Sequence, residues 1–253
     1  VADATSGVLS YSVDGSGNLT FIDSDYQGGT YTDVWAKNGV VYCSCGTEGI
    51  RSYSVDEFGV LTYLDTDIQG SGEYLGIYGD DNYVYCACGT DGVRAYETIE
   101  CGSSSSSSVS SSSSSSSTVT CDMLLVETET STTNNSKIWI DEPNNIVYFA
   151  RGADDVVESY RFDPVTETLS FVDSAFIGNT VQSVYGDGNF LYITSSNIHT
   201  FTYDSTGSMN YVTSFDPGES TFDVWSDGTY LYGATGTSGT KAYSVDGAGN
   251  LTL

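Results

Sequence analysis

The segment CGTEGIRSYSVDEFGVLTYLD, residues 45–65, contains the pattern that decides the fold. Its central motif, Tyr-Ser-Val-Asp, stands at residues 53–56 and returns at residues 11–14 and 243–246. Degenerate copies begin at Tyr96, Tyr160 and Phe201. The copies are about 42 residues apart, except across one longer interval that contains a serine tract. A fixed period of this length is the signature of a repeat architecture.

Each repeat unit contains four short strands. The first follows a Gly/Asn turn, as at residues 19–23 (LTFID), and the second ends in an aliphatic–aromatic pair such as Val34-Trp35. The third is its hairpin partner, as at residues 40–42 (VVY), and the fourth carries the Tyr-Ser-Val-Asp motif. Four strands in about 42 residues favour a propeller blade over a solenoid, whose strands repeat at shorter periods. The sequence therefore predicts an all-β fold, a single β-propeller domain over residues 1–253 with four-stranded antiparallel blades.

Both ends of the sequence fall inside a repeat unit. Residues 1–14 match the end of a third strand and a fourth strand, and residues 249–253 match a first strand. We therefore expect five complete repeats plus a partial blade shared by the two termini. Three interpretations stay open: a fragment of a larger propeller, an open ring that self-associates through its incomplete terminal blade, or five blades that close directly.

One aromatic side chain recurs at the same position of each repeat. A large ring at this point is suited to packing between adjacent blades, and the alternative is an aromatic surface for carbohydrate. The residues at this position are Trp35, Tyr78, Trp139, Tyr185 and Trp225.

The amino-acid composition of the chain disfavours some classes of binding partner. The chain has 7 Lys+Arg against 34 Asp+Glu, a formal net charge of −27. Nucleic-acid affinity comes largely from basic side chains that neutralise phosphates, so we expect no nucleic-acid partner. No stretch is long and apolar enough to span a bilayer, so no membrane insertion is expected. The acidity is typical of proteins in a saline exterior, and we expect an extracellular or cell-surface location.

A serine-rich insert at 101–121 lies between the second and third complete repeats. It begins at Cys101 and ends at Cys121, which we expect to form a disulfide at its base. The insert is either an O-glycan carrier or a plain solvated loop. Two further C-x-C pairs occupy matching repeat positions and are interpreted as small buried residues, an inter-blade disulfide or, as an alternative, zinc ligands: Cys43, Cys45, Cys86 and Cys88.

Three Asn-x-Ser/Thr triplets are candidate N-glycosylation sites. They begin at Asn18, Asn134 and Asn250, each at a predicted turn or strand edge. Glycans on these residues would make the protein a glycoprotein.

The segments CGTEGIRSYSVD (45–56) and CGTDGVRAYETI (88–99) resemble the LVIVD-type and lactonase-like β-propeller repeats of bacterial secreted and surface proteins. The resemblance covers the chain except the serine insert. It implies propeller blades, and for function it implies only a broad group that includes enzymes, ligand binders and scaffolds.

Carboxylates are the main residues in the sequence that could bind a metal ion. Pairs at i, i+2 face the same side of a strand and, repeated around a ring, could line one mouth of the channel, where calcium is the candidate ion. This set comprises Asp23, Asp25, Asp65, Asp67, Glu127, Glu129 and Asp173. The single histidine, His199, occupies a position that other repeats fill with Leu, Arg, Glu or Lys, which disfavours a Ser-His-Asp hydrolase.

These observations favour a non-catalytic extracellular module with a structural or adhesive role in a surface assembly or filament. No cofactor is required by this interpretation. Two alternatives stay open, a metal-assisted lactonase-like hydrolase and a carbohydrate-binding propeller.

Overall fold

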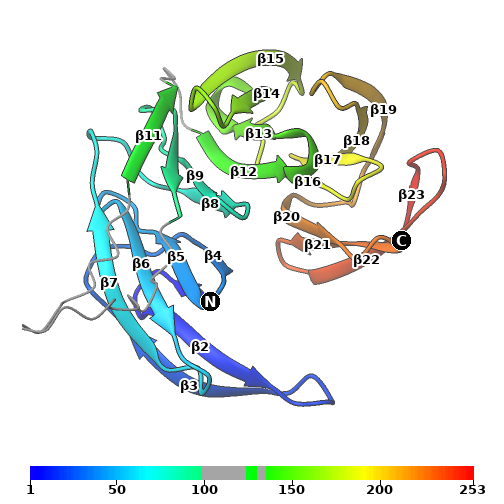
Figure 1. Cartoon of the computed structure of the whole chain (residues 1–253). Helices are drawn as coiled ribbons and strands as arrows, with labels where there is room; N and C mark the ends of the chain where they lie inside the picture. The colour runs from blue at the N-terminus through cyan, green and yellow to red at the C-terminus, as the bar shows by residue number, and fades with distance from the viewer. Residues whose placement is uncertain (99–123, 130–134) are drawn as a thin grey trace, which may run out of the picture.

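The computed structural model describes residues 1–98, 124–129 and 135–253. The serine-rich insert with Cys101 and Cys121, and the sequon residue Asn134, lie outside the described residues. The described chain forms six antiparallel sheets, one with three strands and five with four. It therefore has the predicted all-β propeller architecture, and Figure 1 shows the sheets arranged as blades around a centre.

The sheets follow one another along the chain. Their strands are, in sheet 1, β1 (Ala2–Asp3), β2 (Gly7–Val13) and β3 (Leu19–Asp25); in sheet 2, β4 (Asp33–Lys37), β5 (Val40–Ser44), β6 (Ile50–Val55) and β7 (Leu61–Asp67); in sheet 3, β8 (Gly76–Gly79), β9 (Tyr83–Ala87), β10 (Val93–Glu97) and β11 (Leu124–Glu129); in sheet 4, β12 (Asn135–Asp141), β13 (Ile146–Arg151), β14 (Val156–Asp163) and β15 (Thr168–Phe176); in sheet 5, β16 (Ser183–Gly186), β17 (Leu191–Thr194), β18 (Ile198–Tyr203) and β19 (Met209–Phe215); in sheet 6, β20 (Thr221–Ser226), β21 (Tyr230–Thr235), β22 (Gly239–Val245) and β23 (Leu251–Thr252).

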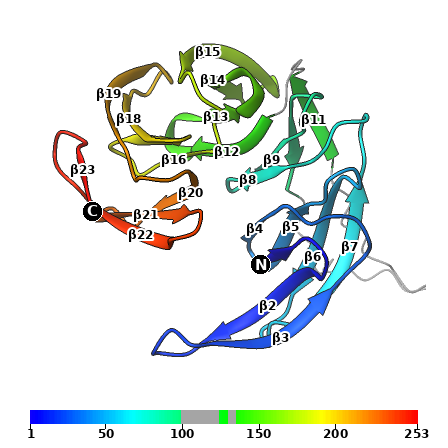
Figure 2. The same ribbon diagram turned by 180° about the vertical axis from the view of Figure 1, so that it is seen from behind.

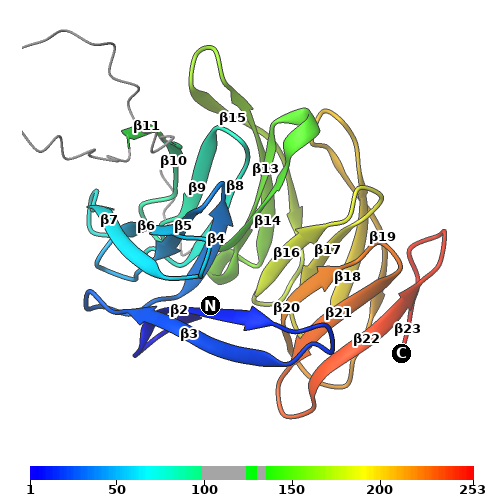
Figure 3. The ribbon, with the colours of Figure 1, turned by 60° about the horizontal axis from the view of Figure 1, so that its bottom comes forward.

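The first strand of each complete sheet lies nearest the centre of the ring. These inner strands, β4, β8, β12, β16 and β20, pack on one another in chain order. Figure 3 shows the neighbouring sheets β16–β19 and β20–β23 side by side. In Figures 1 and 2, sheets 1 and 6 lie at the two ends of the arc.

The expected blade shared by the two termini is wrong. The strand that follows each Tyr-Ser-Val-Asp motif turns back and pairs with the motif strand, so it is the outermost strand of the same sheet rather than the first strand of the next. Thus β3 pairs with β2, and β23 pairs with β22. The described residues therefore form six blades, the first with three strands, and neither terminus completes the sheet of the other.

The aspartate of the motif is the physical reason for this pairing. In the β2–β3 turn the Asp14 carboxylate accepts hydrogen bonds from the backbone N–H groups of Ser16 and Asn18, at 2.8 and 2.9 Å. Gly17 adopts a φ of 82°, which favours glycine. Equivalent turns begin at Asp56, Asp204 and Asp246. A side chain that closes a tight hairpin in this way fixes the following strand beside its predecessor.

Tyrosine supplies much of the core between the blades. Among the described residues, seven of the twelve largest fully buried side chains are tyrosines, which accounts for part of the high tyrosine content of the sequence. Five separate apolar clusters occupy the five junctions between consecutive sheets. Each blade is thus held mainly by its two neighbours, as expected for a repeat protein.

None of the helical segments among the described residues is long and apolar enough to cross a membrane. Self-association through the chain ends stays a prediction.

Candidate active site

The inner strands carry a three-residue pattern in which a variable residue precedes the aliphatic–aromatic pair. Residues i and i+2 of a strand share a face, so the variable residue and the aromatic ring lie on the same side. The variable residues of β4, β12, β16 and β20 line one cavity of about 210 Å³, and that of β8 directly precedes a residue that lines it. They are Asp33, Gly76, Lys137, Ser183 and Asp223.

Four of these residues form a polar group that we call the channel belt: Asp33, Lys137, Ser183 and Asp223. The Lys137 ammonium lies 3.0 Å from a carboxylate oxygen of Asp33 and 3.6 Å from one of Asp223. The Ser183 hydroxyl donates to the other Asp223 oxygen at 2.6 Å. Burial opposes the positive charge of Lys137, but the two carboxylates outweigh it, so the pKa of Lys137 is raised. The belt therefore connects sheets 2, 4, 5 and 6 around the channel.

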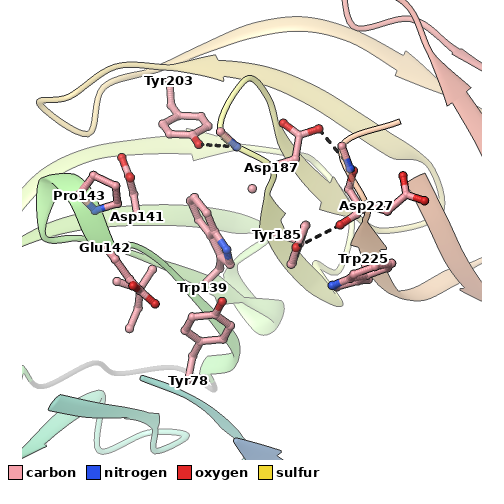
Figure 4. A pocket seen from close by; sticks show the side chains of 15 residues that line it. Tyr78, Trp139, Asp141, Glu142, Pro143, Tyr185, Asp187, Tyr203, Trp225 and Asp227 are labelled. Atoms are coloured by element: carbon pink, nitrogen blue, oxygen red, sulfur yellow. Dashed lines mark hydrogen bonds between the residues drawn. The ribbon is translucent and has the colours of Figure 1, made fainter. Parts of the chain in front are cut away.

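Above the belt stands a collar of aromatic side chains, which we call the aromatic collar: Tyr78, Trp139, Tyr185 and Trp225. These four residues line both the belt cavity and a larger one beyond it. Figure 4 shows the Trp139 ring between Tyr78, Tyr185 and a further aromatic, Tyr203.

Members of the collar differ in exposure. Trp139 is 7% exposed and packs against Tyr148, Tyr185 and Tyr203 with ring centroids 5.5 to 6.2 Å apart. Its ring also lies against Gly186 of the next inner strand, where no Cβ would fit. Trp225 is 54% exposed and stacks on Tyr232. Trp139 thus packs between blades as predicted, whereas Trp225 presents its ring to solvent beside the cavity.

The larger cavity has a volume of about 640 Å³ and lies at the mouth of the channel. Besides the collar, it is lined by the residues that follow β12, β16 and β20, at the point where each inner strand ends. Four carboxylates line this mouth, Asp141, Glu142, Asp187 and Asp227. A cavity of this size suits a small molecule, and its apolar wall with a few polar groups is typical of ligand sites.

Two of the mouth carboxylates have structural partners. Asp187 and Asp227 each accept two backbone N–H groups of their own hairpin turn and a tyrosine hydroxyl. The hydrogen bonds from the backbone N–H groups of Tyr230 and Thr229 lower the pKa of Asp227. Both side chains are held in place at the rim by these contacts.

The other two carboxylates lie at the end of β12 and in the turn that follows it. Asp141 is buried and accepts a hydrogen bond from the Asn144 side-chain amide at 2.8 Å, which closes the short 3₁₀ turn η1 (Glu142–Asn144). Glu142 opens this turn and is exposed at the cavity. Glu142 and Asp227 are thus the exposed carboxylates of the mouth, and the oxygens of Asp227 already accept hydrogen bonds from its own turn.

Tyrosine hydroxyls provide hydrogen-bond donors in this acidic setting. The Tyr203 hydroxyl accepts the Gly188 backbone N–H at 3.1 Å, which leaves its proton free to be donated. Burial and the nearby Asp141 raise the pKa of Tyr203 to about 12. Burial also raises the pKa of Tyr78 and of Tyr185. All three phenols therefore stay protonated at neutral pH.

The carboxylates predicted from the sequence lie elsewhere. Asp23, Asp65, Glu127 and Asp173, with their i+2 partners where present, are on β3, β7, β11 and β15, the outermost strands. The expectation that they line a channel mouth is wrong, because the motif hairpin places these strands at the rim of each blade.

Two of these aspartates link neighbouring blades. Asp23 accepts the backbone N–H of Leu61 in the next sheet at 2.9 Å, and Asp173 accepts that of Met209 at 2.8 Å. Within the described residues no three His, Cys, Asp or Glu side chains come together in a way that could hold a metal ion. Calcium binding by the predicted carboxylates stays a prediction.

The structure also places the four C-x-C cysteines and the single histidine. The thiols of Cys43, Cys45, Cys86 and Cys88 are free and buried. Burial raises the pKa of Cys45 to about 12, so this thiol stays protonated. His199 is half-buried, with Nε2 3.1 Å from the Ser195 hydroxyl, and lies outside both cavities.

Two predicted glycosylation sites lie in exposed hairpin turns. The side-chain amides of Asn18 and Asn250 donate to Asp14 and Asp246, at 2.8 and 2.9 Å. Their glycosylation stays a prediction.

The mouth carboxylates and the channel belt were not identified from the sequence. One available signal was the residue before each aliphatic–aromatic pair, which is charged in three of five repeats. That position would have pointed to Asp33, Lys137 and Asp223. Glu142 carried a weaker signal, the turn DEPNN (141–145), which is longer than its counterparts.

Comparison with known proteins finds similarity only at the level of structure. No family model matches the sequence. No curated protein matches it either. A candidate 6-phosphogluconolactonase from Bacteroides fragilis shares 14% identity at a TM-score of 0.79, over 96% of this chain and 75% of that one.

Two further structures give the same result. A periplasmic gluconolactonase from Pseudomonas aeruginosa shares 13% identity at a TM-score of 0.79, over 98% of this chain and 76% of that one. A candidate 6-phosphogluconolactonase from Bacteroides uniformis shares 14% identity at a TM-score of 0.76, over 99% and 78%. Likeness at this identity establishes the fold, a β-propeller shared with these structures, and does not confirm the LVIVD-type name.

The expectation of a non-catalytic structural or adhesive module is corrected by this comparison. The similar structures carry lactonase names, and none of the three is described as a filament or surface protein. The finding favours the alternative of a lactonase-like hydrolase.

Proposed function

We propose that this protein is a hydrolase of sugar lactones that acts in the mouth cavity. One observation carries the proposal. The cavity brings an accessible carboxylate, protonated phenols and broad aromatic faces together at the channel mouth of a fold shared with structures named as lactonases. Each of these three features supplies one requirement of lactone hydrolysis.

The aromatic faces bind the sugar ring. A pyranose or furanose ring presents C–H groups on its faces, and the exposed ring of Trp225 offers a flat apolar surface beside the cavity. The hydroxyl groups of the sugar have carboxylate and phenol partners around the mouth. This division between apolar wall and polar rim orients the lactone.

Glu142 acts as the general base. Its carboxylate is exposed to the cavity and removes a proton from the water that attacks the lactone carbonyl carbon. Asp141 is a positioning residue, because its hydrogen bond to Asn144 holds the η1 turn from which Glu142 projects. The proton taken by Glu142 is then returned to the ring oxygen when the C–O bond breaks, giving the open-chain hydroxy acid.

The phenols stabilise the oxyanion. Attack by water leaves a negative charge on the former carbonyl oxygen, which needs fixed hydrogen-bond donors. Tyr203 is the candidate donor, since it lines the cavity and its oxygen accepts the Gly188 N–H, which leaves its own proton to be donated, whereas the Tyr185 hydroxyl already donates to the Ser226 carbonyl. Every step therefore uses groups of this chain. No three His, Cys, Asp or Glu side chains among the described residues come together as metal ligands, and the proposed steps use none.

The proposal is tested by following proton release from glucono-δ-lactone at constant pH, with the spontaneous rate subtracted. Glu142→Gln is expected to lower kcat about 10²–10⁴-fold, as expected for loss of a general base. Tyr203→Phe is expected to lower kcat at least about tenfold with little change in KM. Glu57→Gln, an exposed glutamate in the β6–β7 turn, is the matched control and keeps the wild-type rate. Wild-type protein that gives only the spontaneous rate refutes the proposal.

We also infer an extracellular or envelope location. The net charge of −27 and the periplasmic location printed for one similar structure support it. Fractionation of the source cells with an antibody to this chain tests it, and a signal confined to the cytosol refutes it.

A further inference from the structure

The two connected cavities are lined by charges of nearly one sign. Six carboxylates and a single ammonium group line them among the described residues. Four of the carboxylates stand at the mouth, and two belong to the channel belt together with Lys137. With these groups ionised the lining has a net charge of about −5.

The single ammonium group cannot serve an anionic ligand. Lys137 lies below the aromatic collar, and its charge is already shared between Asp33 and Asp223 at 3.0 and 3.6 Å. A phosphate or carboxylate at Lys137 would lie beside both of these aspartates and be repelled by them. Neither cavity contains an arginine among its described lining residues, the side chain best suited to phosphate.

The carboxylates fixed at the mouth add to the electrostatic repulsion of an anionic ligand. Asp187 and Asp227 are held by hydrogen bonds within their own turns, so they cannot swing away from an approaching anion. Glu142 and Asp227 are exposed and Asp187 is half-buried, so an approaching anion meets several like charges at once. Like charges brought together at a binding site disfavour the wrong ligand, most strongly at low ionic strength.

We propose that the site selects neutral lactones and rejects phosphorylated ones. This inference rests on the proposed function and specifies its substrate class. A phosphate group adds about 1.5 to 2 negative charges at neutral pH, all of which would be unpaired in this cavity. The similar structures named 6-phosphogluconolactonases share the fold, but the lining of this chain differs from what a phosphorylated substrate requires.

The same charge also favours release of product. Hydrolysis adds water to a neutral lactone and yields a hydroxy acid that loses a proton at neutral pH, so a neutral ligand becomes an anion within the cavity. The carboxylates that reject phosphate also repel this carboxylate. The protein is therefore expected to show little inhibition by aldonate.

The first experiment compares kcat/KM for glucono-δ-lactone and for its 6-phosphate at low ionic strength. A preference of at least about hundredfold for the neutral lactone is expected. Asp223→Asn removes one belt charge and leaves Lys137 less neutralised, so it is expected to reduce this preference about three- to tenfold. Glu57→Gln, which lies away from both cavities, is expected to leave the preference unchanged. Equal or faster turnover of the phosphate overturns the inference.

A second experiment separates this inference from the proposed hydrolysis. The fluorescence of the collar tryptophans reports binding of the non-hydrolysable gluconolactam and of its 6-phosphate. Tighter binding of the neutral lactam supports charge selection even if neither lactone is hydrolysed, a result that refutes only the proposed function. Tighter binding of the phosphorylated lactam, or equal binding of the two, overturns the inference whatever the hydrolysis assay shows.

Discussion

Replacement of Gly186 by alanine tests how the aromatic collar is held. Gly186 ends the inner strand β16, and the Trp139 ring of the preceding blade lies flat against it. A Cβ atom at this position would lie 2.7 Å from Cζ2 of Trp139, and closer still to Cζ3 and Cη2. Real carbon atoms do not approach so closely, so the indole ring must move.

The ring has little room in which to move. Trp139 is 7% exposed and is surrounded by Tyr148, Tyr185 and Tyr203. Overpacking a core of this kind costs typically 1–3 kcal/mol, so we expect Gly186→Ala to destabilise by about 2 kcal/mol. For a chain of this size 1 kcal/mol lowers Tm by about 2–4 °C, which gives a decrease of about 4–8 °C. Because Trp139 also lines the mouth cavity, lactone turnover should fall as well.

The assay is thermal unfolding followed by near-ultraviolet circular dichroism, which reports tryptophan packing directly. Gly247→Ala is the matched control, since a Cβ there meets nothing within 4 Å and no change beyond about 0.5 kcal/mol is expected. Trp139→Phe removes the clashing part of the ring. In the double variant the cost of Gly186→Ala should therefore be smaller than in the wild-type background.

Two results would refute this reasoning. One is a Gly186→Ala variant with wild-type Tm and near-ultraviolet spectrum. The other is strict additivity of Gly186→Ala with Trp139→Phe, which would mean that the two residues do not press on each other.

Two further predictions concern charged groups. Lys137→Met leaves Asp33 and Asp223 facing each other without a cation, so it should lower stability by about 1–2 kcal/mol at pH 7. Because the pKa of Lys137 is raised in the folded state, this difference is fully present below the ordinary value of 10.5 and is lost only as the pH rises through the raised value; a difference that disappears below pH 10.5 in denaturant titrations would contradict the argument. Glu219 has its pKa lowered from 4.5 to about 2, first by a hydrogen bond from Ser238. Its stabilising effect is present above pH 4.5 and is lost as the pH falls towards 2, so Glu219→Gln should have a lower Tm at pH 7 and the wild-type Tm at pH 2.

The repeat could be predicted because its signals come from residues that are close together in the sequence. The Tyr-Ser-Val-Asp motif, its period and its hairpin turns depend on neighbouring residues, and these gave the propeller and its four-stranded blades. The boundary between blades was displaced by one strand. The turn at Asp14 resembles a connection between blades in sequence, and only its hydrogen bonds reveal a hairpin that joins β2 to β3.

The site could not be predicted in the same way because it depends on the ring. Asp33, Lys137 and Asp223 lie far apart in the sequence and meet only because three inner strands face one channel. The i, i+2 pairing of Asp23 and Asp25 was visible in the sequence, but the layer of the blade to which β3 belongs was not. Chemistry at a propeller centre is therefore found by first identifying the inner strands.

The most direct test of the central claim is the rate at which purified protein releases protons from glucono-δ-lactone at pH 7 and constant pH. The account predicts a rate proportional to protein concentration and well above the spontaneous one, lost in Glu142→Gln and kept in Glu57→Gln. A rate equal to the spontaneous one, or a Glu142→Gln variant as active as the wild type, would contradict the claim that the mouth cavity hydrolyses lactones through Glu142.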